Sequence, residues 1–247
     1  MTSRAATLDA LRSTIVACRR CPELRRYCAD VASRGKPEFA GQSYWGRPLP
    51  GLGDADARLL IVGLAPAAHG GNRTGRMFTG DGSAAWLARA LYRAGFATLP
   101  SSVKVGDGFA LRDAFITAAL RCAPPLNKPT LRQMANCAPF MRAELEVLQH
   151  LRVAVALGKI AFDTLLARLR ERGFEVPVPR PKFGHGLELS LAWAGRKHPL
   201  TLLTSYHPSR QNTNTGKLTQ QMLDEVFMRA RALLETQGQR AVAAHNR

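Results

Sequence analysis

The chain has 247 residues, of which 46% are hydrophobic, so it is long enough to bury a complete core as one domain. It carries 35 Lys and Arg against 18 Asp and Glu, which gives a formal net charge of +17. This excess is spread along the chain and indicates a polyanionic partner, with nucleic acid favoured over an anionic membrane surface. The alternative is a basic surface without such a partner.

Membrane-spanning and secreted classes are not favoured. No run approaches the roughly 18 apolar residues of a membrane span, and the N-terminal sequence lacks the apolar core of a signal peptide. We therefore expect a cytoplasmic protein that has reduced thiols and does not contact the membrane. Nothing in the sequence indicates oligomerisation, so we expect a monomer.

Four short apolar runs predict buried strands, at 58–62, 115–120, 153–157 and 200–204. Helical patterns occur at 1–33 (two helices broken near residues 18–22), 83–94, 130–150, 159–172 and 217–234. Strands that alternate with helices predict an α/β fold with a parallel sheet covered by helices on both faces. Without a clear linker or internal repeat, residues 1–247 are expected to form a single domain, in which about 235–247 is a flexible tail.

A long glycine-rich segment, GLAPAAHGGNRTGRMFTGDGS at 63–83, joins the first predicted strand to a helix. Glycine lets the backbone approach a ligand closely, and open α/β sheets bind ligands at the carboxyl ends of their strands. Gly70 and Gly75 have the spacing of a P-loop, but Arg76 and Met77 stand where a phosphate-binding Lys and a magnesium-binding Ser or Thr are needed. A structural loop without a ligand is the other alternative, and the length of the segment favours a binding function.

Two further loops contain residues suited to binding. Residues 35–53 are rich in Gly and Pro and contain Phe39, Tyr44 and Trp45. These aromatic side chains either pack the loop against the protein or lie beside a nucleic-acid groove. The segment YHPSRQNTNTGK at 206–217 directly follows the fourth predicted strand and is polar and rich in Asn and Thr.

The five cysteines comprise Cys18-x-x-Cys21, then Cys122 and Cys137 with fourteen residues between them, and Cys28. A tetrathiolate site needs four sulfurs brought together by the fold, and the helix break and the end of the second strand are plausible places for it. Such a site suits either zinc or a [4Fe–4S] cluster. The spacing favours a metal site of one of these two kinds over scattered core cysteines, with Cys28 as a thiol that binds no metal.

These motifs resemble the uracil-DNA glycosylase superfamily, and most of all its family 5, the type B enzymes. The resemblance rests on GLAPAAH at 63–69 with the glycine-rich residues behind it, on the cysteine pattern, and on HPSRQNTNTGKL at 207–218. It implies a three-layer α/β/α domain with a four-stranded parallel sheet. It also implies a [4Fe–4S] cluster that anchors loops near the DNA surface and takes no part in catalysis. The implied ligands are Cys18, Cys21, Cys122 and Cys137.

The implied activity is that of a monofunctional DNA repair glycosylase that acts on double-stranded DNA of the nucleoid. Such an enzyme flips a damaged base out of the duplex and hydrolyses its N-glycosidic bond, which leaves an abasic site. The alternative from another class is a non-catalytic nucleic-acid-binding protein with an iron–sulfur or zinc site.

The resemblance implies roles for four residues around the flipped base. Phe78 is expected to stack on the base, with ordinary core packing as the alternative. Asp81 is expected to stabilise the sugar cation and orient water, although it also stands where the N-cap of the 83–94 helix belongs. His207 is expected to donate to the base carbonyl, with a structural turn as the alternative, and His69 to contact phosphate or the pocket wall.

Other positions bear on which bases are accepted. Leu64 and Ala65 stand where many superfamily members carry a catalytic Glu, Asp or Asn, so the pocket wall at Ala65 is inert, as in family 5. Ala118 stands where relatives strict for uracil carry Asn, and Asn127 is expected to read the base edge in its place. Losing a bidentate amide relaxes discrimination. We therefore expect a range that covers uracil and hypoxanthine and extends to hydroxymethyluracil or ethenocytosine.

The polar loop after the fourth predicted strand is the expected wedge and backbone clamp. Arg210 or Gln211 is expected to fill the gap left by the flipped nucleotide. Ser209, Asn212 and Lys217 suit phosphate contacts, which position the protein without specifying sequence. The net charge of +17 predicts binding that weakens steeply with salt.

Overall fold

The centre of the molecule is a mixed β-sheet. The computed structural model describes residues 3–194 and 198–245, with side chains up to residue 236. Within these residues the sheet has six strands in the order β1-β3-β2-β4-β6-β5. The strands are β1 (Leu52–Gly53), β2 (Leu59–Gly63), β3 (Ala114–Ala118), β4 (Val153–Leu157), β5 (Glu188–Leu191) and β6 (Leu200–Ser205).

The four strands predicted from the sequence are β2, β3, β4 and β6, and they run parallel to one another. All of their residues are buried, because helices cover both faces of the sheet. Successive side chains point to opposite faces: Leu59 and Ile61 belong to one core cluster, and Leu60 and Val62 to the other. The predicted α/β class is therefore confirmed.

The two outer strands were not predicted, and they correct the expected four-stranded sheet to one of six strands. β1 and β5 pair antiparallel with β3 and β6. β1 is two residues long, and β5 is largely exposed or half-buried. Neither strand therefore has the continuous apolar run by which the parallel strands were recognised.

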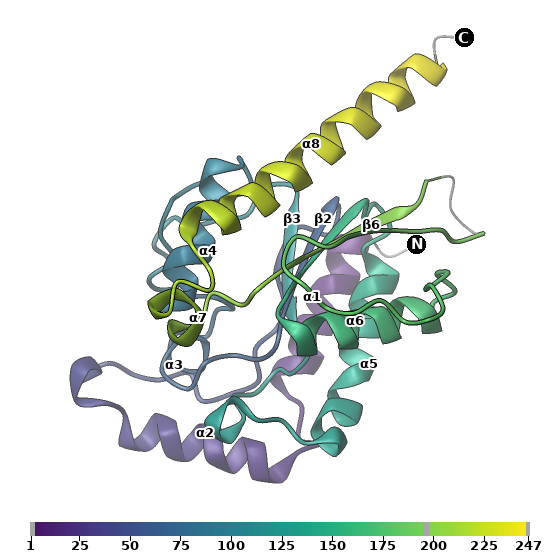
Figure 1. The fold of residues 1–247 in the computed structure, drawn as a ribbon. Coiled ribbons are helices and arrows are strands. Elements are labelled where there is room, and N and C mark those ends of the chain that lie inside the picture. The colour runs from purple at the N-terminus through teal and green to yellow at the C-terminus, as the bar shows by residue number, and fades with distance from the viewer. Residues whose placement is uncertain (1–2, 195–197, 246–247) are drawn as a thin grey trace.

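Helices lie on both sides of the sheet and give the three layers that the sequence predicts (Figure 1). One face is covered by α4 (Gly82–Arg93) and α8 (Gln220–His245), the other by α5 (Leu131–Val147) and α6 (Lys159–Glu171). On that second side, α1 (Arg4–Val16) packs on α5. The helix α2 (Pro22–Arg34) lies below the sheet in Figure 1 and contacts the short α3 (Gly71–Thr74). Among the described residues, no helix is long and apolar enough to cross a membrane.

Local sequence signals explain several helix ends. At the start of α5 the expected capping box is present, since the Gln133 N–H donates to Thr130 Oγ1 at 3.2 Å and the Thr130 N–H donates to Gln133 Oε1 at 3.0 Å. The last helix begins at Gln220, because part of the predicted loop before it is a separate helix, α7 (Arg210–Asn214). It then continues through the expected tail as far as His245, and residues 246–247 lie outside the described residues.

All four parallel strands end at one edge of the sheet. The segments that follow them, 64–81 after β2, 119–130 after β3, Gly158 after β4 and 206–217 after β6, are therefore neighbours. The Ala119 and Leu120 N–H groups donate to the carbonyls of Gly63 and Leu64 at 3.0 and 2.9 Å, so the pairing of β3 with β2 continues into these loops. This carboxyl edge holds most of the predicted site residues.

Candidate active site

Phe78 covers the carboxyl end of β2. Its backbone adopts a left-handed conformation with φ of 46°, which is rare for a bulky residue. Its ring lies on Gly63, the last residue of β2, where a Cβ would come within 2.8 Å of two ring carbons. Glycine at this position is therefore required by the ring above it, and such strained aromatic residues cluster at functional sites.

His207 lies beside Phe78, two residues after the end of β6. The ring centroids are 6.0 Å apart and the planes are inclined by 33°. The His207 carbonyl accepts a hydrogen bond of 2.8 Å from the Asn212 side chain, which fixes the turn into α7. Burial lowers the pKa of His207 to about 4, so its imidazole is neutral at pH 7.

Asp81 caps α4 and also faces the glycine-rich loop. Its Oδ1 accepts a hydrogen bond of 2.9 Å from the Ala84 N–H, which confirms the N-cap expected from the sequence. Its Oδ2 lies against Gly70, where a Cβ would come within 1.9 Å of that oxygen. Burial raises the pKa of Asp81, while the first N–H groups of α4 and the cations Arg73 and Arg210 oppose that rise.

His69 is fixed by contacts with the loop at 35–53. The Tyr44 hydroxyl lies 3.0 Å from His69 Nδ1, and the two rings meet edge to face at 5.9 Å. Arg73 donates to the His69 carbonyl at 2.8 Å, and its guanidinium stacks on the Phe39 ring at 3.8 Å. Burial, together with nearby cations, lowers the pKa of His69. Phe39 and Tyr44 therefore pack the loop at 35–53 against the protein, which is one of the two roles expected for its aromatic residues. Trp45 is 37% exposed.

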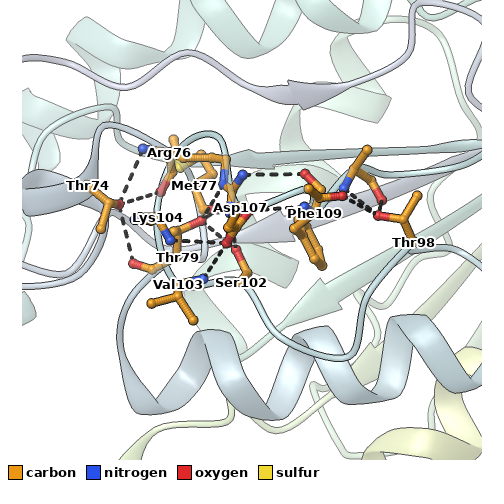
Figure 2. Close-up of polar contacts among 12 residues, drawn as sticks. Thr74, Arg76, Met77, Thr79, Thr98, Ser102, Val103, Lys104, Asp107 and Phe109 are labelled. Atoms are coloured by element: carbon orange, nitrogen blue, oxygen red, sulfur yellow. Dashed lines mark hydrogen bonds and ion pairs between the residues drawn. The ribbon is translucent and has the colours of Figure 1, made fainter.

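A buried ion pair holds the glycine-rich loop in shape (Figure 2). Arg76 Nη2 donates to both carboxylate oxygens of Asp107 at 2.8 Å and to Ser102 Oγ at 3.0 Å, and Arg76 Nε donates to Thr79 Oγ1 at 2.9 Å. Burial alone would raise the pKa of Asp107. The backbone N–H groups of its own loop and the Arg76 guanidinium outweigh that effect and hold the pKa well below its usual range.

This network, which we call the Arg76–Asp107 clamp, has two consequences. Arg76 is committed to Asp107 and so is not placed to bind a phosphate, which agrees with the rejection of a P-loop. Arg76 and Thr79 also lie on either side of Phe78 in the chain, so the clamp fixes the backbone at that strained residue.

Four cysteines line a single small pocket. They are Cys18, Cys21, Cys122 and Cys137. The remaining cysteine, Cys28, accepts a hydrogen bond from the Cys122 thiol and donates one to the Ala123 carbonyl at 3.6 Å. Within residues 3–194 and 198–245, no three His, Cys, Asp or Glu side chains are grouped closely enough to hold a single metal ion.

Arginine side chains border this cysteine pocket. Arg121 is 1% exposed and donates through Nη2 to Glu144 Oε2 at 2.6 Å, and Thr117 Oγ1 donates to the same oxygen at 2.6 Å. Arg121 Nε and Nη1 and Arg25 Nη1 are buried, and the described part of the chain gives them no hydrogen-bond partner. Both arginines line the pocket. Because unpaired buried donors are costly, the pocket is suited to an anionic group.

The uracil DNA glycosylase superfamily model matches residues 50–231. The chain belongs to this superfamily. It is 48% identical to a type-5 uracil-DNA glycosylase of Thermus thermophilus, over 91% of this chain and 97% of that protein. It is 46% identical to a type-5 uracil-DNA glycosylase of Mycobacterium tuberculosis, over 93% of this chain and 82% of that protein. A type-4 uracil-DNA glycosylase of Pyrobaculum aerophilum is more distant, at 28% identity over 65% of this chain. The family resemblance seen in the sequence, and with it the assignment to an enzyme family, is confirmed.

In this glycosylase the fold brings some of the predicted residues of the base site together and places others elsewhere. Phe78 and His207 are in contact, and Ala118 is buried beside them where it pairs with Gly63. Ala65 lies a short way along the loop and packs against the cysteine cluster. Asn127 stands apart, exposed in the 3₁₀ helix η2 (Pro125–Asn127) with φ of 56°.

The predicted DNA-contacting residues are partly committed to the protein itself. Ser209 accepts from the Asn212 N–H at 3.4 Å as the N-cap of α7, and the Asn212 side chain holds the His207 carbonyl. The Lys217 ammonium lies 4.8 Å from the centre of the Tyr206 ring. Arg210 and Gln211 are exposed on α7, which replaces the loop expected there.

The sequence did not identify Asp107 and Arg73 as supporting residues of the site. Asp107 lies 31 positions from Arg76, and only the fold brings the two together. One signal was available: Arg76 directly precedes two large apolar residues, Met77 and Phe78, and a cation that is buried with them needs a partner.

We predict that Asp107→Asn weakens the clamp. Asparagine still accepts hydrogen bonds from the backbone but leaves the Arg76 charge buried, so we expect the free energy of unfolding to fall by about 3 kcal/mol in urea denaturation. The control is Glu188→Gln, which breaks an exposed pair with Arg229 and is expected to cost less than about 1 kcal/mol. Equal losses in the two variants would show that the clamp has no special role.

Proposed function

We propose that this glycosylase excises uracil from double-stranded DNA by hydrolysing the N-glycosidic bond, as a monofunctional enzyme that leaves an abasic site. The proposal depends chiefly on the contact between Phe78 and His207 at the carboxyl edge, in a chain whose relatives are named type-5 uracil-DNA glycosylases. A base inside a duplex cannot enter such a site, so the nucleotide is flipped out first.

Phe78 and His207 act on the base. The Phe78 ring offers a flat apolar surface for stacking, and its strained backbone is held by the Arg76–Asp107 clamp. His207 is neutral, so it donates a ring N–H to the base carbonyl as negative charge develops on the leaving base. A fixed donor in a buried site stabilises that charge more than water does.

Asp81 acts on the sugar and on water. The sugar gains positive charge as the bond breaks, and a partly desolvated carboxylate stabilises that charge strongly. Oδ1 is occupied by the α4 cap, so Oδ2 is the oxygen assigned to this role. Leu64 and Ala65, at the positions of the usual superfamily polar groups, provide no alternative.

We propose a broad range of bases, comprising hypoxanthine, hydroxymethyluracil and ethenocytosine as well as uracil. Ala118 is buried next to Gly63 and has no polar group with which to select the uracil edge. Asn127 is exposed and therefore available to a base edge in the DNA complex.

Double-stranded DNA is the proposed partner, bound across the carboxyl edge. The exposed Arg210, Gln211 and Lys217 are available to phosphates there, Ser209 and Asn212 shape the turn, and His69 forms part of the wall. The net charge of +17 supports strongly salt-dependent binding. A monomeric state and association with the nucleoid stay predictions.

A [4Fe–4S] cluster is the proposed cofactor, held by Cys18, Cys21, Cys122 and Cys137. These thiols surround one pocket without forming a group that suits a single ion. Four thiolates suit either zinc or a [4Fe–4S] cluster, and the resemblance to family 5 favours the cluster. The unpaired guanidinium N–H groups around the pocket also suit an anionic cluster. When bound, the cluster would cross-link α2, the exit of β3 and α5, without a catalytic role.

A non-catalytic DNA-binding protein is the second candidate. It is favoured by one observation, the apolar Leu64 and Ala65 at the positions where many superfamily members carry a catalytic polar group. Such a protein would bind the same DNA with the same salt dependence but would leave every base in place. The next experiment distinguishes the two.

We predict that the wild type creates alkali-labile sites in a duplex with one uracil opposite guanine, and that Asp81→Ser lowers the rate by roughly 10²- to 10⁴-fold. Serine keeps the N-cap without the charge, so its melting temperature should match the wild type. Asp81→Ala also loses the cap and should unfold about 1 kcal/mol more easily. Full activity in Asp81→Ser would show that Asp81 only caps α4 and has no catalytic role. No cleavage by the wild type of uracil or hypoxanthine substrates would favour the binding protein.

We predict that protonation of His207 causes no change in the rate between about pH 6 and pH 8. His207 gains a proton only near pH 4. The pKa of Asp81 is raised, so as the pH falls its carboxylate becomes protonated at a higher pH than that of a solvated Asp. The measurement is the single-turnover rate of uracil release against pH. An inflection near the ordinary histidine value of 6.5 that disappears in His207→Asn would contradict the assigned state of His207.

We predict that anaerobically purified protein contains iron and sulfide with visible charge-transfer absorption. Cys122→Ser should lose most of both, because it removes a ligand, whereas Cys28→Ser should keep them. These contents are measured without reference to activity. Zinc in place of iron, or an equal loss of iron in Cys28→Ser, would contradict the proposed cofactor or its ligand set.

A further inference from the structure

The segment after Cys122 contains an unusual leucine. Leu126 is 83% exposed and has φ of 54° and ψ of 20°, in the left-handed region that bulky side chains rarely occupy. A single exposed leucine is ordinary. A leucine that is both exposed and held at an unfavourable backbone conformation is not, because glycine or asparagine would fill such a position without strain.

The segment is held rigidly in this conformation. Pro124, Pro125 and Pro129 fix their own φ angles on both sides of Leu126. The Asn127 N–H donates to the Pro124 carbonyl at 3.1 Å, and the next N–H donates to the Pro125 carbonyl at 3.0 Å. The leucine is thus presented outward on a stiff turn, and burial in the protein does not account for its side chain.

The turn emerges at the edge of the sheet where the base site lies. It follows β3, whose last residue, Ala118, pairs with Gly63 beneath the Phe78 ring. The pairing continues through Leu120, and Leu126 follows Ala118 by eight residues. The turn therefore leaves the sheet at the same edge as the base site.

We propose that Leu126 is the apolar wedge that enters the base stack where the flipped nucleotide leaves it. This inference rests on the proposed function. Proteins that unstack duplex DNA commonly insert an apolar side chain between base steps, and a rigid turn transmits force to the stack without collapsing. Arg210 and Gln211 are the wedge residues expected from the sequence. They are polar and lie on α7, where they are better suited to contact DNA phosphates than to enter the base stack.

The test uses Leu126→Gly, which removes the side chain and suits the left-handed backbone, so the fold is preserved. Leu126→Phe keeps an apolar wedge. The control is Leu131→Ala, since Leu131 is 91% exposed but begins α5 with ordinary helical geometry. Uracil release is measured from single-stranded and duplex DNA, and from a duplex with a pyrene nucleotide opposite uracil, whose bulk pushes the base outward.

We expect Leu126→Gly to lose roughly tenfold or more of its duplex rate while its single-strand rate stays within about twofold of wild type. The pyrene duplex should restore most of the loss, and Leu126→Phe and Leu131→Ala should behave as wild type. An unchanged duplex rate in Leu126→Gly, an equal loss on single strands, or an equal loss in Leu131→Ala would overturn the wedge. Absence of uracil release by the wild type from every substrate would instead refute the proposed function.

Discussion

The buried ion pair between Arg121 and Glu144 joins the parts of the molecule that form its carboxyl edge. Arg121 directly precedes Cys122, and Glu144 lies two helical turns beyond Cys137 on α5, on the same side of the helix. Thr117 in β3 donates to the same carboxylate, so the sheet, the helix and the cysteine pocket share one network. Charges that are 1% exposed are tolerated only as a pair, and a change to either partner would disturb all three parts.

Three residues at this edge have a backbone conformation or a charge state that is unfavourable on its own, and a different segment stabilises each of them. Phe78 keeps its left-handed backbone because Arg76 is clamped to a loop more than 20 residues further along the chain. Asp81 keeps its half-buried carboxylate because the first N–H groups of α4 bond to it. His207 loses the proton that an exposed histidine would carry at mildly acidic pH, because partial burial of its ring lowers its pKa. The site is therefore organised before any substrate arrives.

The sequence predicted those features whose cause is local. The run VAVAL at 153–157 identified β4 because both of its faces are buried, and the capping box identified the start of α5. The outer strand β1 could not be recognised, because its two residues depend on β3 for their pairing. Phe78 and Asp81 were found through a contiguous motif. Asp107 was not, since its role exists only where the fold brings it to Arg76, and the strain at Leu126 has no signature in the sequence.

The 26-residue helix α8 is about 39 Å long at 1.5 Å per residue, whereas the six residues of β6 span about 20 Å. The helix follows α7 after a five-residue connection, packs along α4 and projects well past the opposite side of the sheet (Figure 1). Its far end is thus the part of the backbone most removed from the proposed DNA surface. A surface anchor or fluorophore attached there would orient every molecule with its carboxyl edge facing solution, so α8 provides a natural handle for single-molecule observation of DNA.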